Sequence, residues 1–187
     1  AGGWTLGAQP GQNTLSATAP GLPPVTFTAT GTAGQPATLS VSAGSDQVAP
    51  AGSPVAAAPA VLVRDASNNP LQGVQVTFQV TAGGGSITGG SATTGANGVA
   101  AAGGWTLGTQ AGQNTVSATV QGLPPVSFTA TGVAGPPSSL EIVAGNNQSA
   151  QAGSAVSTAP AVRVRDAHGN AVAGTPVSFA VTAGGGS

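Results

Sequence analysis

The sequence predicts an all-β chain built from antiparallel β-sandwiches that repeat every 101 residues. Apolar and polar residues alternate over short runs, which is the pattern of half-buried strands. No window shows the three- and four-residue apolar spacing of an amphipathic helix, and glycine or proline interrupts the chain roughly every ten residues. The third observation is that one long segment occurs twice.

The repeated segments are residues 2–31 and 103–132, which carry the same residue at 24 of 30 positions. Trp4 recurs as Trp105, an offset of 105 − 4 = 101 residues. Self-similarity at a fixed period identifies an array of one unit. A unit of this length is large enough to bury a core of its own.

This period divides the chain into three segments. We expect residues 1–34 to be the C-terminal half of one repeat, residues 35–135 a complete repeat, and residues 136–187 the N-terminal half of the next. The chain is expected to be an interior piece of a longer array. Each half alone would expose an apolar sheet face and unpaired strand edges, so we expect neighbouring repeats or other chains to complete it.

Seven strands are expected in the complete repeat, at residues 37–43, 58–65, 74–81, 87–94, 99–107, 114–120 and 126–131. The first places Leu39 and Val41 on one face. It is expected to be split, because residues 44–46 and 50–52 interrupt the run twice with Gly, Ser, Asp and Pro.

Comparison of the two copies identifies the buried face of the second strand. Val61 and Val63 are expected to face inward, whereas Leu62 is replaced by Arg163 in the later copy. An arginine is costly in a core and harmless in water, so Leu62 is expected to face outward.

A turn is expected at residues 65–73, which combine Asp, Asn, Pro and Gly between two alternating runs. Asn68 becomes Gly169 in the later copy. Asn and Gly best tolerate a positive φ, so the sequence predicts a left-handed backbone at this position.

The remaining strands complete the sandwich. Residues 87–94 are expected to form one short edge strand, and residues 99–107 to place Gly103, Trp105 and Leu107 on one side. Strand parity predicts further inward side chains at Val74, Val76, Phe78, Val80, Val116, Ala118, Val120, Val126, Phe128 and Ala130. Seven strands without helices indicate a two-sheet sandwich of immunoglobulin type.

Composition excludes several classes of function. Charged residues are 4% of the chain and the net charge is −1, so the sequence shows no electrostatic footprint for nucleic acid. Cysteine is absent, which leaves no thiol chemistry and no disulfides. No apolar run approaches the roughly 18 residues of a membrane helix, so no membrane span is expected in this segment.

Two aspartates are candidate metal ligands. Asp65 and Asp166 stand at strand ends beside Asn-rich turns, where a calcium ion could gather oxygen ligands. Only one carboxylate per unit lies there, and calcium sites usually collect several. The sequence favours a structural role, with the Asp side chain accepting backbone N–H groups of its own turn.

Other candidates for chemistry are also better explained structurally. His168 corresponds to Ser67, so an exposed turn residue is expected rather than a catalytic base. Trp105 could be a sugar-stacking platform, but strand parity favours burial beside Phe78 and Phe128.

No catalytic group is expected in the chain. Its serines and threonines lack an accompanying base, and no carboxylate pair is present for acid–base work. Residues 83–85 and 103–104 are glycine runs that precede no helix, so they indicate tight bends or close strand packing rather than a phosphate site. Asn147 begins a short glycan-acceptor pattern that often arises by chance. We expect no enzyme, no cofactor and no metal.

The ordered motifs resemble a known family, the bacterial immunoglobulin-like group 1 domain of invasin- and intimin-type surface proteins. The resemblance is carried by a valine-rich strand ending in Asp65, the Asn-Pro-x-x-Gly turn at residues 69–73, the V-x-V-x-F strand at residues 74–78, the Thr-x-x-x-Gly turn at residues 94–98, and the G-x-N-x-V-x-A strand at residues 112–118. It covers the whole unit and its partial copies. It implies tandem surface-exposed domains that act as stalks, spacers or adhesive rods.

Together these features predict a structural repeat of a bacterial extracellular filament, stalk or adhesin rod, located outside the cell or at its surface. The expected partners are copies of the chain itself, arranged head-to-tail, with lateral contact between copies as an open alternative. The alternative is an adhesive module that binds a glycan or a host protein. That alternative predicts a concave or apolar surface patch with Trp105 at least partly exposed.

Overall fold

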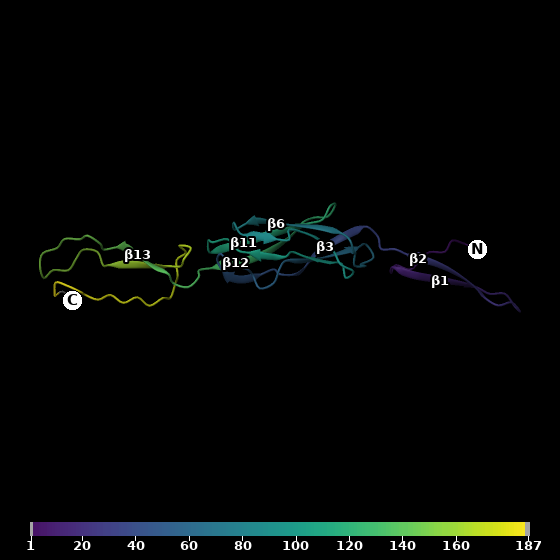
Figure 1. The fold of residues 1–187 in the computed structure, drawn as a ribbon, viewed down its shortest axis with the longest axis horizontal. Coiled ribbons are helices and arrows are strands. Elements are labelled where there is room, and N and C mark those ends of the chain that lie inside the picture. The colour runs from purple at the N-terminus through teal and green to yellow at the C-terminus, as the bar shows by residue number, and fades with distance from the viewer. Residues whose placement is uncertain (1, 186–187) are drawn as a thin grey trace.

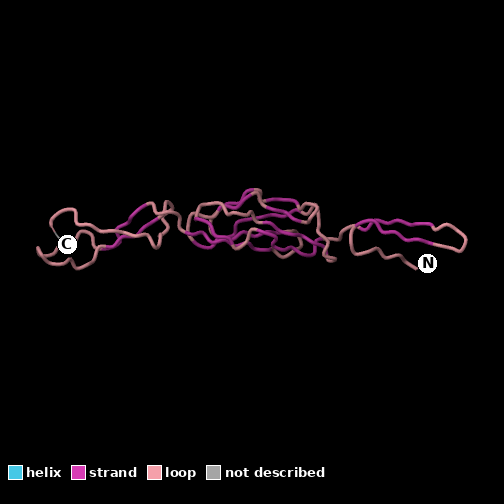
Figure 2. The backbone as a smooth tube through the Cα atoms, turned by 90° about the horizontal axis from the view of Figure 1, so that it is seen from below, coloured by secondary structure: helices cyan, strands magenta, loops and turns pink. Residues whose placement is uncertain are grey.

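The computed structural model describes residues 2–185, so Ala1, Gly186 and Ser187 lie outside it. Across these residues the regular structure consists of strands, and no helix is long and apolar enough to cross a membrane (Figure 2). The strands are β1 (Gly11–Ala17), β2 (Val25–Gly31), β3 (Pro36–Ala43), β4 (Gln47–Pro50), β5 (Ala60–Asp65), β6 (Gln75–Ala82), β7 (Ser86–Thr88), β8 (Ser91–Thr93), β9 (Val99–Ala101), β10 (Gly104–Thr106), β11 (Gly112–Thr119), β12 (Val126–Val133), β13 (Ser139–Ala144) and β14 (Ala161–Arg165).

The strands form three bodies arranged in a line (Figure 1). The β1–β2 hairpin lies at the N-terminal end, strands β3 to β12 form a sandwich in the middle, and the β13–β14 hairpin lies at the opposite end. Residues 34 and 135 fall in the connections between these bodies. The domain boundaries predicted there stay a prediction.

The central sandwich contains a five-stranded sheet ordered β4-β12-β11-β6-β8 and a three-stranded sheet ordered β3-β5-β9, with β7 paired to β10. The predicted all-β, Ig-like sandwich is confirmed. One pair departs from the antiparallel expectation, since β4 runs parallel to β12. The expected split of the first strand explains this, because β3 and β4 belong to different sheets. The chain crosses at Gly44, whose φ is 86° and where a Cβ would lie 2.4 Å from the Ala58 carbonyl oxygen.

Two other predicted strands are each divided into two strands in the structure. Residues 87–94 were wrongly assigned as a single edge strand: β7 and β8 lie in different sheets, and Gly89 turns the chain between them with φ 57°. Residues 99–107 likewise divide into β9 and β10. Gly103 lies exposed at that break, so its predicted place beside Trp105 and Leu107 was wrong, and Ala102 is buried instead. The break shifts the alternation by one residue.

The core agrees with the predicted strand parity. Val61 and Val63 are fully buried, and Trp105 is 1% exposed. Phe78 and Phe128 pack with ring centroids 6.2 Å apart and planes tilted by 50°, a favourable aromatic geometry. Val116 and Ala118 on β11, Val120 directly after it and Ala130 on β12 complete the buried set. At the rim, Leu39 is half-buried and Val41, on the same strand, is largely exposed.

The N-terminal hairpin has the same strand register as its counterpart in the sandwich. Gly11 pairs with Gly31 and Ala17 with Val25 in β1–β2, whereas Gly112 pairs with Gly132 and Ala118 with Val126 in β11–β12. Equivalent sequence therefore adopts an equivalent hairpin in the two places. What differs is the packing, because the sandwich covers the apolar face of only the second.

Candidate functional site at the aspartate–asparagine junctions

The turn that follows β14 is held by the side chain of Asp166. Its Oδ1 atom accepts hydrogen bonds from the N–H groups of His168 (2.9 Å) and Asn170 (2.8 Å). Its Oδ2 atom accepts one from the Asn170 side-chain amide (2.9 Å) and one from the N–H of Gly135 (2.8 Å). Gly135 lies in the connection between β12 and β13. One carboxylate therefore joins the turn to the linker from the sandwich.

Asn170 extends this connection into the sandwich. Its Nδ2 donates to the Thr109 carbonyl (2.9 Å), and its Oδ1 accepts from the Ala111 N–H (2.8 Å). Both partners lie in the loop before β11. The buried amide thus uses both of its donors and its acceptor, which favours one fixed orientation of the two bodies.

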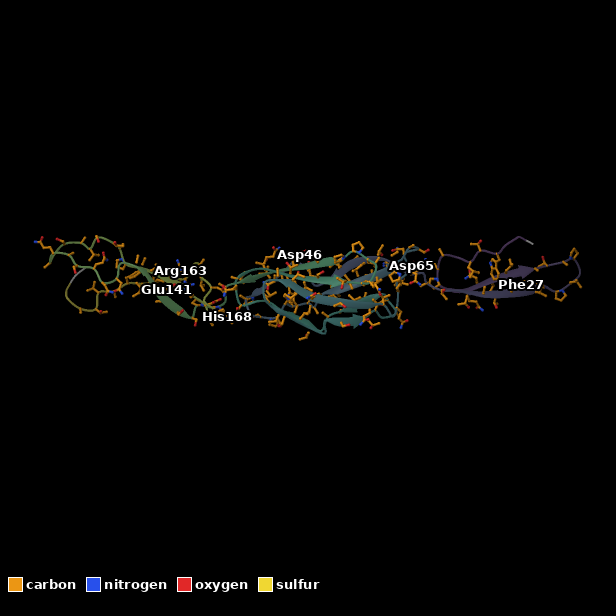
Figure 3. All side chains as sticks on the ribbon, turned by 90° about the horizontal axis from the view of Figure 1, so that it is seen from above. Phe27, Asp46, Asp65, Glu141, Arg163 and His168 are labelled. Atoms are coloured by element: carbon orange, nitrogen blue, oxygen red, sulfur yellow. The ribbon has the colours of Figure 1, made fainter. Side chains whose placement is uncertain are left out.

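The same arrangement occurs 101 residues earlier, at Asp65 (Figure 3). Its carboxylate accepts from the N–H groups of Ser67 (2.9 Å), Asn69 (2.8 Å) and Gly34 (2.9 Å), and from the Asn69 side chain (3.0 Å). Asn69 Nδ2 also donates to the Ala8 carbonyl (2.8 Å). We call each set of contacts an Asp–Asn junction: Asp65, Asn69, Gly34 and Ala8 form the first, and Asp166, Asn170, Gly135 and Thr109 form the second.

The two junctions differ by one hydrogen bond. The buried Asn69 Oδ1 has no hydrogen-bond partner within the described residues, whereas the equivalent Asn170 Oδ1 accepts from the N–H of Ala111. Pro10 is the counterpart of Ala111, and proline has no N–H to donate. The missing donor explains the orphaned oxygen.

The turn itself is shaped by its sequence. Asn68 has φ 68° and Gly169 has φ 84°, which confirms the predicted left-handed position. An arginine side chain hydrogen-bonds to the carbonyl of this residue in each turn: Arg64 donates to the Asn68 carbonyl (2.7 Å), and Arg165 donates to the Gly169 carbonyl (2.6 Å). The predicted acceptance of turn N–H groups by Asp65 is also confirmed. The hydrogen bonds that these aspartates accept from outside the turn, from the N–H groups of Gly34 and Gly135, were not predicted.

His168 is exposed in its turn, as predicted, but it also contributes to the second junction (Figure 3). Its ring lies against Gly52 of the sandwich, where a Cβ would come within 2.7 Å of Nε2. A side chain at this position would displace the ring, and the φ of 78° at Gly52 also favours glycine. Since Gly52 follows β4, the contact places the edge of the sandwich against the next body.

The other sequence candidates lie away from the junctions. Gly83 and Gly85 are close-packed, since a Cβ at Gly83 would lie 2.3 Å from Asn114 Oδ1, whereas Gly84 between them lies in open space with φ 72°, as in a tight bend. Asn147 is exposed in the turn after β13. Among residues 2–185, no three His, Cys, Asp or Glu side chains gather as metal ligands do. Each carboxylate oxygen of Asp65 and Asp166 already accepts two N–H groups.

Hydrogen bonding stabilises the ionised form of both aspartates. The Asn69 side chain, and after it the Gly34 N–H, lower the pKa of Asp65 from 3.8 to about 2. The Asn170 side chain likewise holds the pKa of Asp166 well below its ordinary value. The junctions are therefore built around a negative charge.

Replacing Ala111 by Pro is expected to give the second junction the same unpaired asparagine oxygen as the first. Loss of the N–H leaves Asn170 Oδ1 buried without a donor, which costs about 1–3 kcal/mol and is offset by up to about 1 kcal/mol from the stiffer unfolded chain. Urea unfolding of the full chain should show the loss. Thr109→Ala, which introduces the residue found at Ala8, is the control because Thr109 contributes only its carbonyl. Equal stability of the two variants would contradict the assigned hydrogen bond.

Acid is expected to weaken the first junction over a defined range. Because the pKa of Asp65 is lower in the folded chain, its ionised form stabilises the fold fully above pH 3.8, and this contribution is lost as the pH falls to about 2. The melting temperature measured across this range should fall more steeply for the parent chain than for Asp65→Asn. Parallel curves would show that the carboxylate is not held as described.

Several solved structures are similar to this chain. InvD of Yersinia pseudotuberculosis is similar over 87% of this chain and 52% of its own, with 16% identity and a TM-score of 0.50. A β-glucuronidase of Parabacteroides merdae matches 58% of this chain and 15% of its own (19% identity, TM-score 0.39), and the D00–D0 domain of intimin matches 59% and 56% (19% identity, TM-score 0.40). The chain thus spans between 15% and 56% of the lengths of these proteins. No curated protein matches it.

The family is shown by a direct match of the sequence. The family model described as bacterial Ig-like domain (group 1) matches residues 38–133, which are 133 − 38 + 1 = 96 of the 187 residues. This range contains the whole central sandwich apart from the first residues of β3. The chain belongs to the bacterial Ig-like domain (group 1) family.

Proposed function

We propose that this chain is a structural repeat of a bacterial extracellular filament, stalk or adhesin rod, in which successive Ig-like units are joined end to end at the cell surface. The observation that carries the proposal is the recurrence of the Asp–Asn junction. The proposal assigns no catalytic reaction, cofactor or metal to the chain. Its partners are copies of the same unit, on the same chain or on another.

The junction geometry supports a load-resisting role. A flexible tether between two domains needs only a linker, whereas here a buried carboxylate and a buried amide bind backbone groups on both sides of each boundary. Domains with few contacts across the linker move independently by default. Specific buried hydrogen bonds oppose that motion, since bending would leave polar groups unpaired. Stiff axial connection is what a stalk requires.

Family membership and composition agree with this function. The match to a bacterial Ig-like family fits a surface-exposed repeat protein. With 4% charged residues, the chain has little long-range repulsion to oppose contact between copies. Cohesion would come from apolar burial and strand pairing.

The adhesive alternative has less support. It predicted an apolar or concave surface patch with Trp105 at least partly exposed, and the Trp105 side chain is buried in the sandwich core. The rod is therefore the function that the geometry supports best.

Distance measurements by pulsed electron paramagnetic resonance can test the rod. The chain has no cysteine, so Thr38→Cys and Ser139→Cys place two spin labels at equivalent exposed positions of β3 and β13, one on each side of the second junction. Dilution with unlabelled chain removes contributions from neighbouring molecules. The rod predicts a narrow distance distribution that broadens in Asn170→Ala, because the variant loses the bonds to Thr109 and Ala111.

Asn146→Ala is the matched control, since Asn146 lies in the same body and its side chain accepts only from the neighbouring Asn147 N–H. It should leave the distribution narrow. A parent distribution as broad as that of Asn170→Ala would overturn the rod.

A further inference from the structure

Each unit of the proposed rod is joined to its neighbours through two adjacent strands. The linker at Gly34 leads into β3 and, past the crossing at Gly44, into β4, whereas β12 leads out to the linker at Gly135. The two linkers leave the sandwich at its opposite ends (Figure 1). Because β4 and β12 pair in parallel, a pull along the rod draws them past each other along their length.

This geometry loads the β4–β12 ladder in shear. Strands that are pulled past each other along their length must break the hydrogen bonds between them together, whereas strands peeled apart from one end break them one at a time. The outermost bonded residues are Ala51 on one side and Thr129 on the other. The residues between them, which number 128 − 52 + 1 = 77, cannot be extended while the ladder holds, because the pull passes directly from β4 to β12.

Hydrogen bonds at Thr129 strengthen the start of the ladder. The Thr129 carbonyl accepts from the Asp46 N–H (2.7 Å), and the Thr129 N–H donates to Ser45 Oγ (3.2 Å). The Thr129 hydroxyl also donates to the carboxylate of Asp46, which lies on the outside of the sandwich (Figure 3). A hydrogen bond to a charged group is stronger than one between neutral groups. At the other end the Ala51 N–H donates to the Val133 carbonyl (2.8 Å), so hydrogen bonds continue the ladder beyond β4 at both ends.

A glutamine side chain ties β4 to the rest of the sandwich. Gln47 Nε2 donates to the carbonyls of Gly44 (3.0 Å) and Ala57 (2.8 Å), and Gln47 Oε1 accepts from the Ala57 N–H (2.8 Å). Its counterpart Gln148 makes the same two bonds with the backbone of Thr158. The tie therefore recurs in both copies, although the residue that it binds changes from Ala to Thr. Sliding β4 along β12 would break it.

We propose that the β4–β12 ladder, reinforced at Thr129 and Gln47, is the element that resists axial force in each unit. This inference rests on the proposed function and names the contacts by which a unit of the rod resists extension. Detaching β3 from β5 would free only residues 35–46, which number 46 − 35 + 1 = 12. The rest of the unit therefore stays folded until the β4–β12 ladder breaks.

Single-molecule measurements at constant force can test this element in the full chain. The chain has no cysteine, so Gln35→Cys and Pro136→Cys place DNA handles at exposed positions at the two ends of the unit. The change Thr129→Val removes the hydroxyl donor to Asp46 and keeps the backbone bonds. We expect the lifetime of the unit under force to fall about threefold to tenfold, because rupture no longer has to break a charge-assisted hydrogen bond at an exposed site.

Thr81→Val is the matched control for this measurement. The Thr81 hydroxyl donates to the Thr115 carbonyl (3.3 Å) between β6 and β11, within the residues that the ladder shields from the pull. The lifetime under force should therefore stay that of the parent. Urea unfolding of both variants measures their stability without force. An unchanged lifetime in Thr129→Val, or an equal fall in Thr81→Val, would overturn the proposal.

A second pulling direction tests the shear geometry. Gln35 and Gln121 line the same surface groove, together with Pro36 and Thr119, so they lie at one end of the sandwich. Handles at Gln35→Cys and Gln121→Cys pull on that end alone and do not draw β4 and β12 past each other. The unit should then rupture at a lower force than with handles at residues 35 and 136. Equal rupture forces in the two directions would also contradict the proposal.

The outcomes separate this inference from the rod itself. Narrow spin-label distances with no effect of Thr129→Val on the lifetime would keep the rod and reject the ladder as its force-resisting element. A shortened lifetime in Thr129→Val together with broad distances would keep the ladder and reject the stiff junction.

Discussion

The structure depends on a buried carboxylate that must be surrounded by hydrogen-bond donors. An ionised aspartate out of water is costly unless its lone pairs are used. The turns after β5 and β14 supply three donors each, to Asp65 and Asp166, and the fourth donor comes from the linker of the preceding body, at Gly34 or Gly135. Because one donor belongs to the neighbour, satisfying the charge also fixes where the neighbour lies. The hydrogen bonds of the turn therefore also position neighbouring bodies relative to each other along the chain.

The asparagine four residues later extends this constraint, and it also explains why the two junctions are not identical. Asn170 binds two backbone groups of the sandwich, whereas Asn69 reaches only the Ala8 carbonyl, because Pro10 supplies no N–H. A single exchange between copies therefore alters the strength of a junction without altering its geometry.

Sequence reasoning predicted the sandwich and its core well, since burial of Val61, Val63 and Phe128 follows from two-residue alternation and from comparison of the copies. The left-handed Asn68 followed from its replacement by glycine. The strand breaks near Gly89 and Gly103 were missed, because a bend inside an alternating run leaves the local pattern almost unchanged. The junction was missed for another reason. Asp65 and Gly34 are 31 residues apart, and a backbone N–H donor leaves no trace in residue type. The orphaned oxygen of Asn69 could have been anticipated only by aligning Pro10 with Ala111 and knowing where Asn69 points.

The aspartates of the turns after β5 and β14 hold the linker glycines, and amide hydrogen exchange measured by NMR tests these contacts at single atoms. We expect the N–H groups of Gly34 and Gly135 to exchange on the order of tenfold to a hundredfold more slowly than that of Gly21, an exposed turn glycine, and Asp65→Asn to remove the protection at Gly34 alone. Exchange of Gly34 and Gly135 at the rate of Gly21 would contradict the assigned contacts, because the linkers would then be free of the carboxylates that define the junctions.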